Sequence, residues 1–183
     1  MKAKIWGLGL SRTGTTTLGK VLNEAGYNWL HYPKHGQMDA MNNDGAGDIP
    51  VLLDYKRLDM KFPNSKFIYT VRDKDEWLES MKKYITRKHK WNQDFISMRQ
   101  VEIREAVYGS RSFNWESYSK AYDRWDNEFR EYFKYRKDDF LVLNILGGDS
   151  PQKLKEFLGT NKKFPDEFPH HNKLIGNESY QIK

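Results

Sequence analysis

A glycine- and threonine-rich segment near the N-terminus has the residue types of an anion-binding loop. Residues 7–18 read GLGLSRTGTTTL and lie between an expected buried strand (3–10) and an expected helix (15–25). Unpaired backbone N–H groups at a helix N-terminus, together with the helix dipole, favour a bound anion. Arg12 adds a cation inside this segment, and three threonines follow Gly14. We therefore predict a phosphate-binding loop here; the alternative is a plain turn with a capping hydroxyl.

This loop matches the nucleotide-binding P-loop, G-x-x-x-x-G-K-[ST], only in part. Gly9 and Gly14 have the motif's spacing and Thr16 has its hydroxyl position, but Thr15 stands in place of the lysine. ATPases and GTPases use that lysine at the phosphates and hold Mg²⁺ with the hydroxyl and a second acidic residue. The dinucleotide fingerprint G-x-G-x-x-G also fails, because Arg12 occupies its third position. An atypical P-loop nucleotide-binding protein or kinase is therefore the alternative function.

Residues 11–16 (SRTGTT) resemble the 5′-phosphosulfate loop of sulfotransferases that use 3′-phosphoadenylyl sulfate (PAPS). That loop reads as a basic residue followed by Ser/Thr-Gly-Thr-Thr. The resemblance implies that Arg12 contacts the phosphosulfate. It also implies that the 5′-phosphate is cradled by the residues that follow, Thr13, Gly14, Thr15, Thr16 and Thr17.

A second segment resembles the 3′-phosphate signature of the same family. This signature is a strand that ends in arginine, with a serine eight residues later; here the strand is 66–71 (KFIYTV), followed by Arg72 and Ser80. The resemblance implies that both side chains bind the 3′-phosphate. Taken alone, Arg72 is an ordinary salt-bridge partner for a nearby aspartate and Ser80 an ordinary helix-surface residue.

The C-terminal part resembles one branch of these sulfotransferases, whose loops often read R-T-G-T-T. The matching segments are 154–159 (LKEFLG) and 168–173 (FPHHNK). The resemblance as a whole implies in-line transfer of a sulfuryl group from PAPS to a hydroxyl or amine, with release of 3′-phosphoadenosine 5′-phosphate (PAP). The acceptor is expected to be a small molecule or a glycan. No metal is expected, and no clear His/Asp/Glu ligand cluster stands in the sequence.

Sulfuryl transfer usually needs a base to take the proton of the acceptor. Cytosolic sulfotransferases place a histidine before Leu-Pro; residues 47–50 read GDIP, so the resemblance places Asp48 at that position. Asp48 before Ile-Pro is equally well suited as a helix N-cap, and both roles stay open. His31 lies at the end of the second expected strand and His35 follows it, near the position of the glutamate base of heparan-type sulfotransferases, and His35 is a further candidate.

The elements that must position these residues alternate between strand and helix. Apolar runs predict buried strands at 3–10, 28–32, 66–71 and 140–145, and helical periodicity predicts helices at 15–25, 49–60 and 151–158. A further helix is expected to be capped by Asp73 or Asp75 and to run to about Lys90. The polar stretch 34–47 reads as a surface loop. Residues 91–135 read as a helical insertion, whose aromatic residues recur at spacings of three and four and indicate an amphipathic core helix. We therefore predict an α/β fold: a P-loop-type parallel sheet with helices on both faces and an aromatic-rich insertion.

The composition agrees with one folded domain. The 183 residues are 38% hydrophobic and 15% aromatic, so we expect a single domain over residues 1–183. The absence of cysteine excludes disulfides, zinc–thiolate sites and cysteine nucleophiles. The net charge of +6 suits an anionic ligand. No RNA-recognition signature accompanies it, so nucleic acid is not an expected partner.

Nothing in the sequence predicts a membrane protein. No apolar run approaches the roughly 18 residues of a membrane span. The apolar stretch at the N-terminus is too short for a signal peptide. The cytoplasm is the expected location.

Overall fold

The computed structural model describes residues 3–33, 41–90 and 98–169. The strands are β1 (Ile5–Gly7), β2 (Trp29–His31), β3 (Gly45–Gly47), β4 (Lys66–Thr70) and β5 (Phe140–Leu143). The helices are α1 (Thr15–Glu24), α3 (Ile49–Lys61), α4 (Lys74–Lys90), α5 (Met98–Tyr108), α6 (Trp115–Tyr132) and α7 (Pro151–Leu158).

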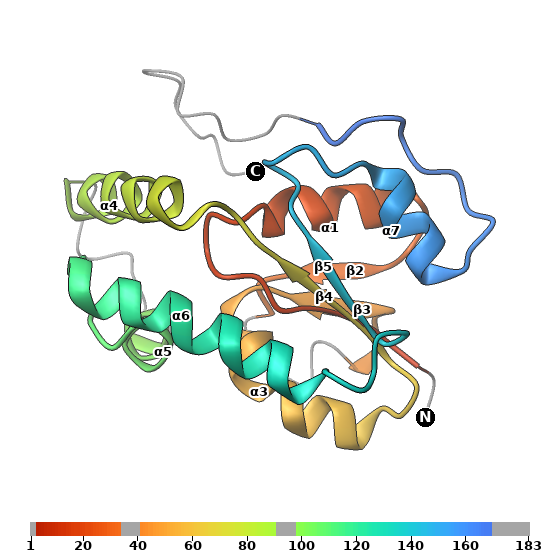
Figure 1. Ribbon diagram of the computed structural model, residues 1–183, viewed down its shortest axis with the longest axis horizontal. Helices are drawn as coiled ribbons and strands as arrows, with labels where there is room; N and C mark the ends of the chain where they lie inside the picture. The colour runs from red at the N-terminus through yellow and green to blue at the C-terminus, as the bar shows by residue number, and fades with distance from the viewer. Residues whose placement is uncertain (1–2, 34–40, 91–97, 170–183) are drawn as a thin grey trace.

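All strands pair in parallel in the order β2-β3-β1-β4-β5. Helices α1 and α7 cover one face of this sheet and α3 and α6 cover the other, while α4 and α5 lie beyond the carboxyl ends of the strands (Figure 1). This arrangement confirms the predicted α/β fold with helices on both faces. In such sheets ligands bind outside the carboxyl ends of the strands, so that edge is where a site is expected.

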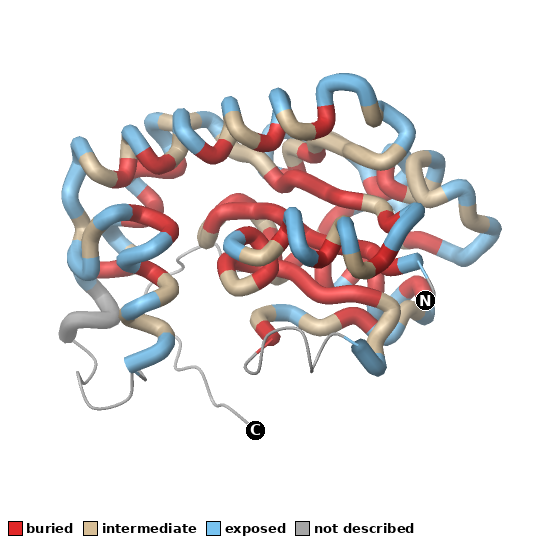
Figure 2. Tube along the Cα trace, turned by 90° about the horizontal axis from the view of Figure 1, so that it is seen from below, coloured by how far each residue is buried: buried red, intermediate tan, exposed pale blue. Residues whose placement is uncertain are grey.

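Alternate strand residues build two separate cores, as the two-residue period of a strand requires. Trp6, Phe67 and Tyr69 point into a large aromatic cluster with α3 and α6. Ile5 and Ile68 point the other way, into a smaller aliphatic cluster with α1 and α7. The strands are therefore buried on both faces, and Figure 2 shows them as a mainly red layer inside the molecule.

The predicted surface loop over residues 34–47 is wrong at its end, where residues 45–47 (GAG) form β3 in the sheet. A Cβ on Gly45 would lie 1.8 Å from the carbonyl oxygen of Ile5, and one on Gly47 would lie 2.4 Å from the ring of Trp29. Tight packing therefore demands glycine in β3. Glycine is depleted in ordinary strands, so the composition suggested a loop. Residues 34–40 lie outside the described ranges.

The helical middle contains two helices, α5 and α6, in its described part. The aromatic residues of α6 are largely core: Tyr118, Trp125 and Phe129 are buried, while Trp115 at the start of the helix is 45% exposed. This confirms the prediction of an amphipathic core helix. The predicted cap of α4 is also present, since the Asp73 carboxylate accepts a hydrogen bond from the Glu76 N–H at 3.0 Å.

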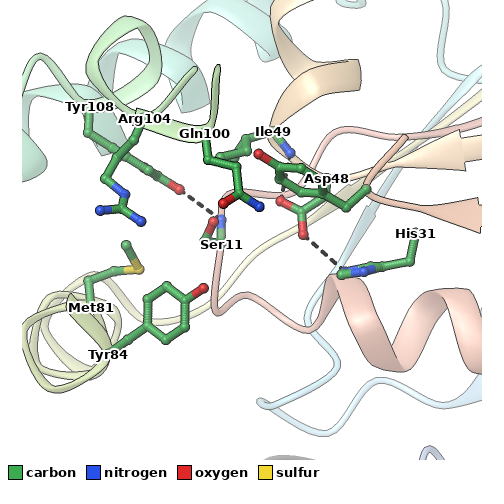
Figure 3. Close-up of a pocket in the computed structure, with 10 residues that line it drawn as sticks. Ser11, His31, Asp48, Ile49, Met81, Tyr84, Gln100, Arg104 and Tyr108 are labelled. Carbon is green, nitrogen blue, oxygen red and sulfur yellow. Dashed lines mark hydrogen bonds and ion pairs between the residues drawn. The ribbon is translucent and has the colours of Figure 1, made fainter. Parts of the chain in front are cut away.

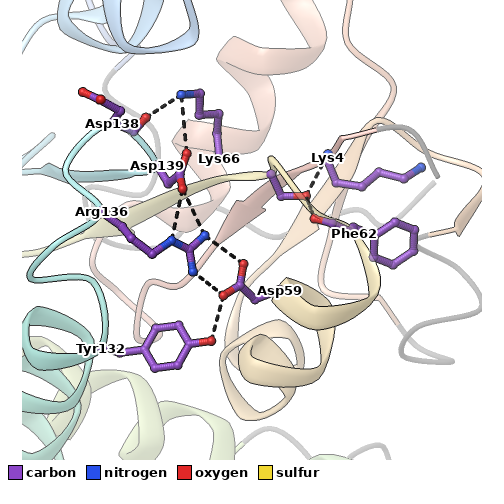
Figure 4. Close-up of polar contacts among 9 residues, drawn as sticks. Lys4, Asp59, Phe62, Lys66, Tyr132, Arg136, Asp138 and Asp139 are labelled. Carbon is purple, nitrogen blue, oxygen red and sulfur yellow. Dashed lines mark hydrogen bonds and ion pairs between the residues drawn. The ribbon is translucent and has the colours of Figure 1, made fainter.

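A polar cluster fastens α3 to the segment after α6 (Figure 4). The guanidinium of Arg136 binds both carboxylate oxygens of Asp59, one of them at 2.9 Å, and also reaches Asp139 at 3.1 Å. The Tyr132 hydroxyl donates to Asp59 at 2.7 Å. Burial alone would raise the pKa of Asp59, but the hydrogen bonds from Arg136 and Tyr132 lower it below its usual value. The cluster therefore supports the aromatic core.

Candidate active site

The predicted phosphate loop runs from β1 to the first turn of α1. A Cβ on Gly9 would lie 1.9 Å from Thr70 Oγ1, so only glycine fits where the loop passes β4. Gly14 precedes α1 with a φ of 104° and has no side chain to cap the helix. The first helical hydrogen bond belongs to Leu18, so the N–H groups of residues 15–17 precede the ladder. The loop thus presents a helix N-terminus of the kind that binds anions.

Side chains from distant elements hold this loop in shape. The Ser11 N–H donates to the Tyr108 hydroxyl at 2.9 Å, and the Trp77 indole N–H donates to the Ser11 carbonyl at 2.8 Å. The Thr13 hydroxyl donates to the Leu10 carbonyl at 2.7 Å and lies 2.8 Å from Thr70 Oγ1. Thr13 is buried, so its hydroxyl shapes the loop from inside, unlike the donors at the start of α1.

Arg12 lies at the tip of the loop with a left-handed backbone, at a φ of 72°. Its Nε donates to the hydroxyl of Ser80 at 3.3 Å, and its guanidinium lies 5.7 Å from the ring centre of Tyr84. Ser80 is buried and faces this loop from α4. The structure therefore brings together two predicted site residues that are 68 positions apart.

Arg72 leaves the carboxyl end of β4, as predicted. Its Nε and Nη2 lie 3.3 and 3.2 Å from a carboxylate oxygen of Glu76, and its carbonyl accepts a hydrogen bond from Tyr122. The alternative interpretation of Arg72 was an ordinary salt bridge to a nearby aspartate. The structure shows a salt bridge, but its partner is Glu76. Within the described residues, the guanidinium of Arg72 makes no direct hydrogen bond to Ser80.

Asp48 is a helix cap, one of the two roles that the sequence left open, and it also contacts His31 and the phosphate loop. Its Oδ1 accepts the Ile49 N–H at 2.6 Å and so caps α3. Its Oδ2 lies 3.0 Å from His31 Nε2 and accepts the Thr15 hydroxyl at 3.1 Å. His31 Nε2 also lies 3.2 Å from Thr16 Oγ1. One carboxylate therefore joins β3, β2 and the start of α1.

The backbone of Asp48 is unusual for a side chain that only caps a helix. Its φ of 80° and ψ of −179° fall in a region that is essentially restricted to glycine. Such a conformation costs on the order of 1–3 kcal/mol, and residues held in it cluster at functional sites. Asp48 is also 6% exposed. The fold thus holds a strained, nearly buried carboxylate beside the phosphate loop.

A pocket of about 210 Å³ opens between the Asp48–His31 pair and helices α4 and α5 (Figure 3). It is lined by Ser11, His31, Tyr32, Asp48, Ile49, Met81, Tyr84, Gln100, Arg104 and Tyr108. Burial raises the pKa of Tyr32 to about 12, with a further increase from the nearby Asp48 carboxylate. Three tyrosines, one histidine, one carboxylate and one arginine therefore face the same space.

Sequence reasoning missed most of this lining. Tyr84, Arg104 and Tyr108 come from α4 and α5, where the pattern of apolar residues indicates a helix but does not show which side chains close a pocket. The predicted candidate His35 lies outside the described residues, as do residues 170–173 of the C-terminal resemblance.

The described residues contain neither a candidate metal cluster nor a candidate membrane span. Among residues 3–33, 41–90 and 98–169, no three His, Asp or Glu side chains are grouped as a metal ion would require. In the same ranges, no helix is both long enough and apolar enough to cross a membrane.

The sequence matches the family model of the sulfotransferase domain over residues 38–175. The chain therefore belongs to the sulfotransferase family, and the family resemblance is confirmed. The matched range begins after the phosphate loop, so the role of that loop stays a prediction.

The fold also resembles a solved enzyme. The crystal structure of a sulfotransferase from Alicyclobacillus acidocaldarius superimposes with a TM-score of 0.60 over 94% of this chain and 87% of that one. The two sequences are 12% identical, so the likeness concerns the fold. Comparison with curated proteins gave no match.

Proposed function

We propose that this sulfotransferase moves a sulfuryl group from PAPS to the hydroxyl or amine of a small acceptor and releases PAP. The observation that carries the proposal is the contact between the phosphate loop and the Asp48–His31 pair. Thr15 belongs to the first turn of α1, and its hydroxyl donates to Asp48. A donor held by the loop and an acceptor next to Asp48 would therefore meet in one place.

The loop suits the 5′ end of the donor. The N–H groups of Thr15, Thr16 and Thr17 point out of the helix N-terminus, where the helix dipole favours negative charge. Gly9 has no side chain, which lets the loop pack closely against its neighbours next to the proposed phosphate site. Arg12, held by Ser80, supplies the cation beside the phosphosulfate. Negative charge develops on the bridging oxygen during transfer, and a fixed cation there lowers the barrier.

Arg72 and Ser80 are proposed to bind the 3′-phosphate. In the structure, the guanidinium of Arg72 contacts one carboxylate oxygen of Glu76. This ion pair is exposed, so it contributes little to stability. A phosphate can replace that carboxylate and form a charge-assisted, bidentate contact with the guanidinium. Donor binding in this account therefore exchanges Glu76 for the 3′-phosphate.

The Asp48–His31 pair is proposed to take the proton of the acceptor. The acceptor oxygen or nitrogen gives its proton to this pair and forms a bond to sulfur, while the bond from sulfur to the bridging oxygen breaks. PAP leaves with that oxygen, so no oxidant, reductant or metal takes part in the balance. His31 is 36% exposed and can pass the proton on to solvent, whereas Asp48 is fixed by three hydrogen bonds or ion pairs.

Transfer of labelled sulfate tests the proposal directly. Purified protein with ³⁵S-labelled PAPS is offered a panel of phenols, sugars and amines, and labelled product is separated from donor. The account predicts labelled product with at least one acceptor and stoichiometric PAP. Hydrolysis of ATP with Mg²⁺ in place of sulfuryl transfer would instead support the atypical P-loop alternative.

A further inference from the structure

Arg104 is a buried cation that faces the pocket from α5. Its side chain belongs to a residue that is 7% exposed, and its Nη1 donates to the Arg111 carbonyl at 3.4 Å, a long hydrogen bond. Within the part of the chain that the structure describes, no carboxylate pairs with this guanidinium. A buried charge without a counter-ion is costly, so an arginine that faces a cavity and has no carboxylate partner among the described residues points to an anionic ligand.

The pocket carries opposite charges at its two ends. Figure 3 shows the Asp48–His31 pair on one side and Arg104 on the other, with Ser11 and Gln100 between them. Tyr32, which also lines the pocket, lies within the influence of both charges. Burial and the Asp48 carboxylate raise the pKa of Tyr32, whereas the Arg104 guanidinium lowers it. A ligand that spans the pocket therefore meets a proton acceptor at one end and a guanidinium at the other.

The residues that line the pocket suit a small, flat ligand. Met81, Tyr84 and Tyr108 line the pocket toward its Arg104 end, and Ile49 lines it next to Asp48. The volume of about 210 Å³ is below the roughly 300–1,000 Å³ of sites for drug-sized ligands. Aromatic walls bind flat rings with a polar edge well. A small ring, or one end of a larger molecule, fits this description.

We propose that the acceptor is a small hydroxy-aryl acid, whose anionic group binds Arg104 while its hydroxyl faces the Asp48–His31 pair. This inference rests on the proposed function and specifies its acceptor. The hydroxyl proton goes to the pair, the phenolic oxygen forms the new bond to sulfur, and the anionic group takes no part in the chemistry. Arg104 is thus a specificity-determining residue that orients the acceptor.

Matched acids and amides test the role of charge. Protein saturated with PAP is titrated calorimetrically with 4-hydroxyphenylacetate and its carboxamide, and with 3-hydroxybenzoate and its carboxamide. We expect at least one acid to bind at least about tenfold more tightly than its amide, as a charge-assisted contact implies. Adding 4-hydroxybenzenesulfonate distinguishes a carboxylate site from a general anion site.

Variants of Arg104 test whether this side chain causes the preference for acids over amides. In Arg104→Gln the preference for acid over amide should fall below about twofold, and in Arg104→Lys it should survive in part, because the charge stays and the planar fork is lost. Arg57→Gln is the matched control: it removes one cation from an exposed position on α3 and should leave the preference unchanged. PAP affinity reports whether each variant is folded; if Arg104→Gln is not, Arg104→Lys decides.

The outcomes separate this inference from the proposed function. Equal binding of acids and amides, tighter binding of amides, no binding of any acid, or an unchanged preference in the folded Arg104 variants overturns the acceptor assignment even when PAP binds. If PAP does not bind the wild-type protein, the donor proposal fails, and the same acid–amide comparison on free protein then decides the role of Arg104.

Discussion

The Asp48 carboxylate gives one oxygen to the start of α3 and the other to His31 and Thr15. The resemblance to cytosolic sulfotransferases placed Asp48 at the position of the base, but no sequence pattern could pair it with His31. The two residues are 17 positions apart, and they meet because β2 and β3 are parallel neighbours that end at the same edge. The strained backbone of Asp48 could not be predicted from the sequence either, because the residue type does not indicate a φ of 80°.

Asp48→Asn separates the proposed catalytic role from capping. Asparagine remains a good N-cap, so thermal stability should change little. PAP affinity should also stay nearly the same, because Asp48 contacts the Thr15 hydroxyl and not the loop N–H groups that are proposed to bind the phosphate. Turnover on a working acceptor should fall by about 10²–10⁴-fold, the usual contribution of a general base. Steady-state kinetics and calorimetry measure both quantities.

The matched control is Asp149→Asn, which neutralises a carboxylate that binds Asn144 and Lys153 and does not line the pocket. Its turnover should stay near that of the wild type. Near-normal turnover of Asp48→Asn would remove Asp48 from the mechanism and direct attention to His31 and His35.

Arg72→Ala tests the 3′-phosphate site. A bidentate, charge-assisted contact contributes about 1.5–3 kcal/mol, which is roughly 10- to 150-fold in affinity. PAP should weaken by that factor, whereas adenosine 5′-phosphosulfate, which has no 3′-phosphate, should change far less. Glu76→Gln is the companion variant: it frees Arg72 from its carboxylate, so PAP should bind as tightly or more tightly. Equal losses for the two nucleotides would show that Arg72 does not bind the 3′-phosphate.

At the scale of elements, β3 is the strand that the sequence did not predict. The other strands are apolar runs and were predicted within a few residues, and the helices that follow them were predicted from their periodicity. Gly45 and Gly47 are required by the crowding of Ile5 and Trp29, a property of tertiary packing that leaves only a loop-like composition in the sequence. The strand that leads directly into Asp48 was therefore the one that was missed.

Gly47→Ala should disturb both the fold and the site. The new Cβ would lie 2.4 Å from the Trp29 ring, and such overpacking typically costs 1–3 kcal/mol. Urea unfolding should show that loss of stability, and turnover should fall further because Asp48 is displaced.

Trp29→Phe is the partner variant in a double-mutant cycle. The smaller ring makes room for the methyl group, so Gly47→Ala should cost less in the Trp29→Phe background than in the wild type. Additive losses would contradict this account of why β3 contains glycine.

At the scale of the whole molecule, the aromatic core on one face of the sheet is closed by the cluster of Asp59, Tyr132 and Arg136. The sequence predicted the aromatic side of α6 correctly, because its period of three and four residues is a local property. It did not predict this cluster, since Asp59 and Arg136 are 77 positions apart and each is an ordinary charged residue in its own segment.

The pH dependence of stability reports this cluster. The pKa of Asp59 is lowered in the folded state, so its contribution is present above the unfolded pKa of about 3.9 and is lost as the pH falls through the lower folded value. Arg136→Met should reduce the free energy of unfolding at pH 7 by roughly 1–3 kcal/mol. The difference from the wild type should shrink as the pH falls below about 4. Urea titrations at a series of pH values measure it.

Arg130→Met is the control for this series. Arg130 pairs with Asp126 at 2.8 Å on the exposed side of α6, with its own side chain 53% exposed. Such a pair is worth only about 0.3–0.5 kcal/mol. A loss in Arg136→Met no larger than that in Arg130→Met would contradict the structural role of the Asp59–Arg136 pair.

The measurement that tests the central claim most directly is the thermal stability of the wild-type protein with PAP and with ATP plus Mg²⁺. A ligand at 100 times its Kd stabilises the folded state by about 2.7 kcal/mol. For a chain of this size that corresponds to a Tm increase of roughly 5–11 °C. The account predicts such an increase with PAP and a much smaller one with ATP and Mg²⁺, because the proposed site binds a 5′-phosphate and a 3′-phosphate together. Equal increases with the two ligands, or none with PAP, would contradict it.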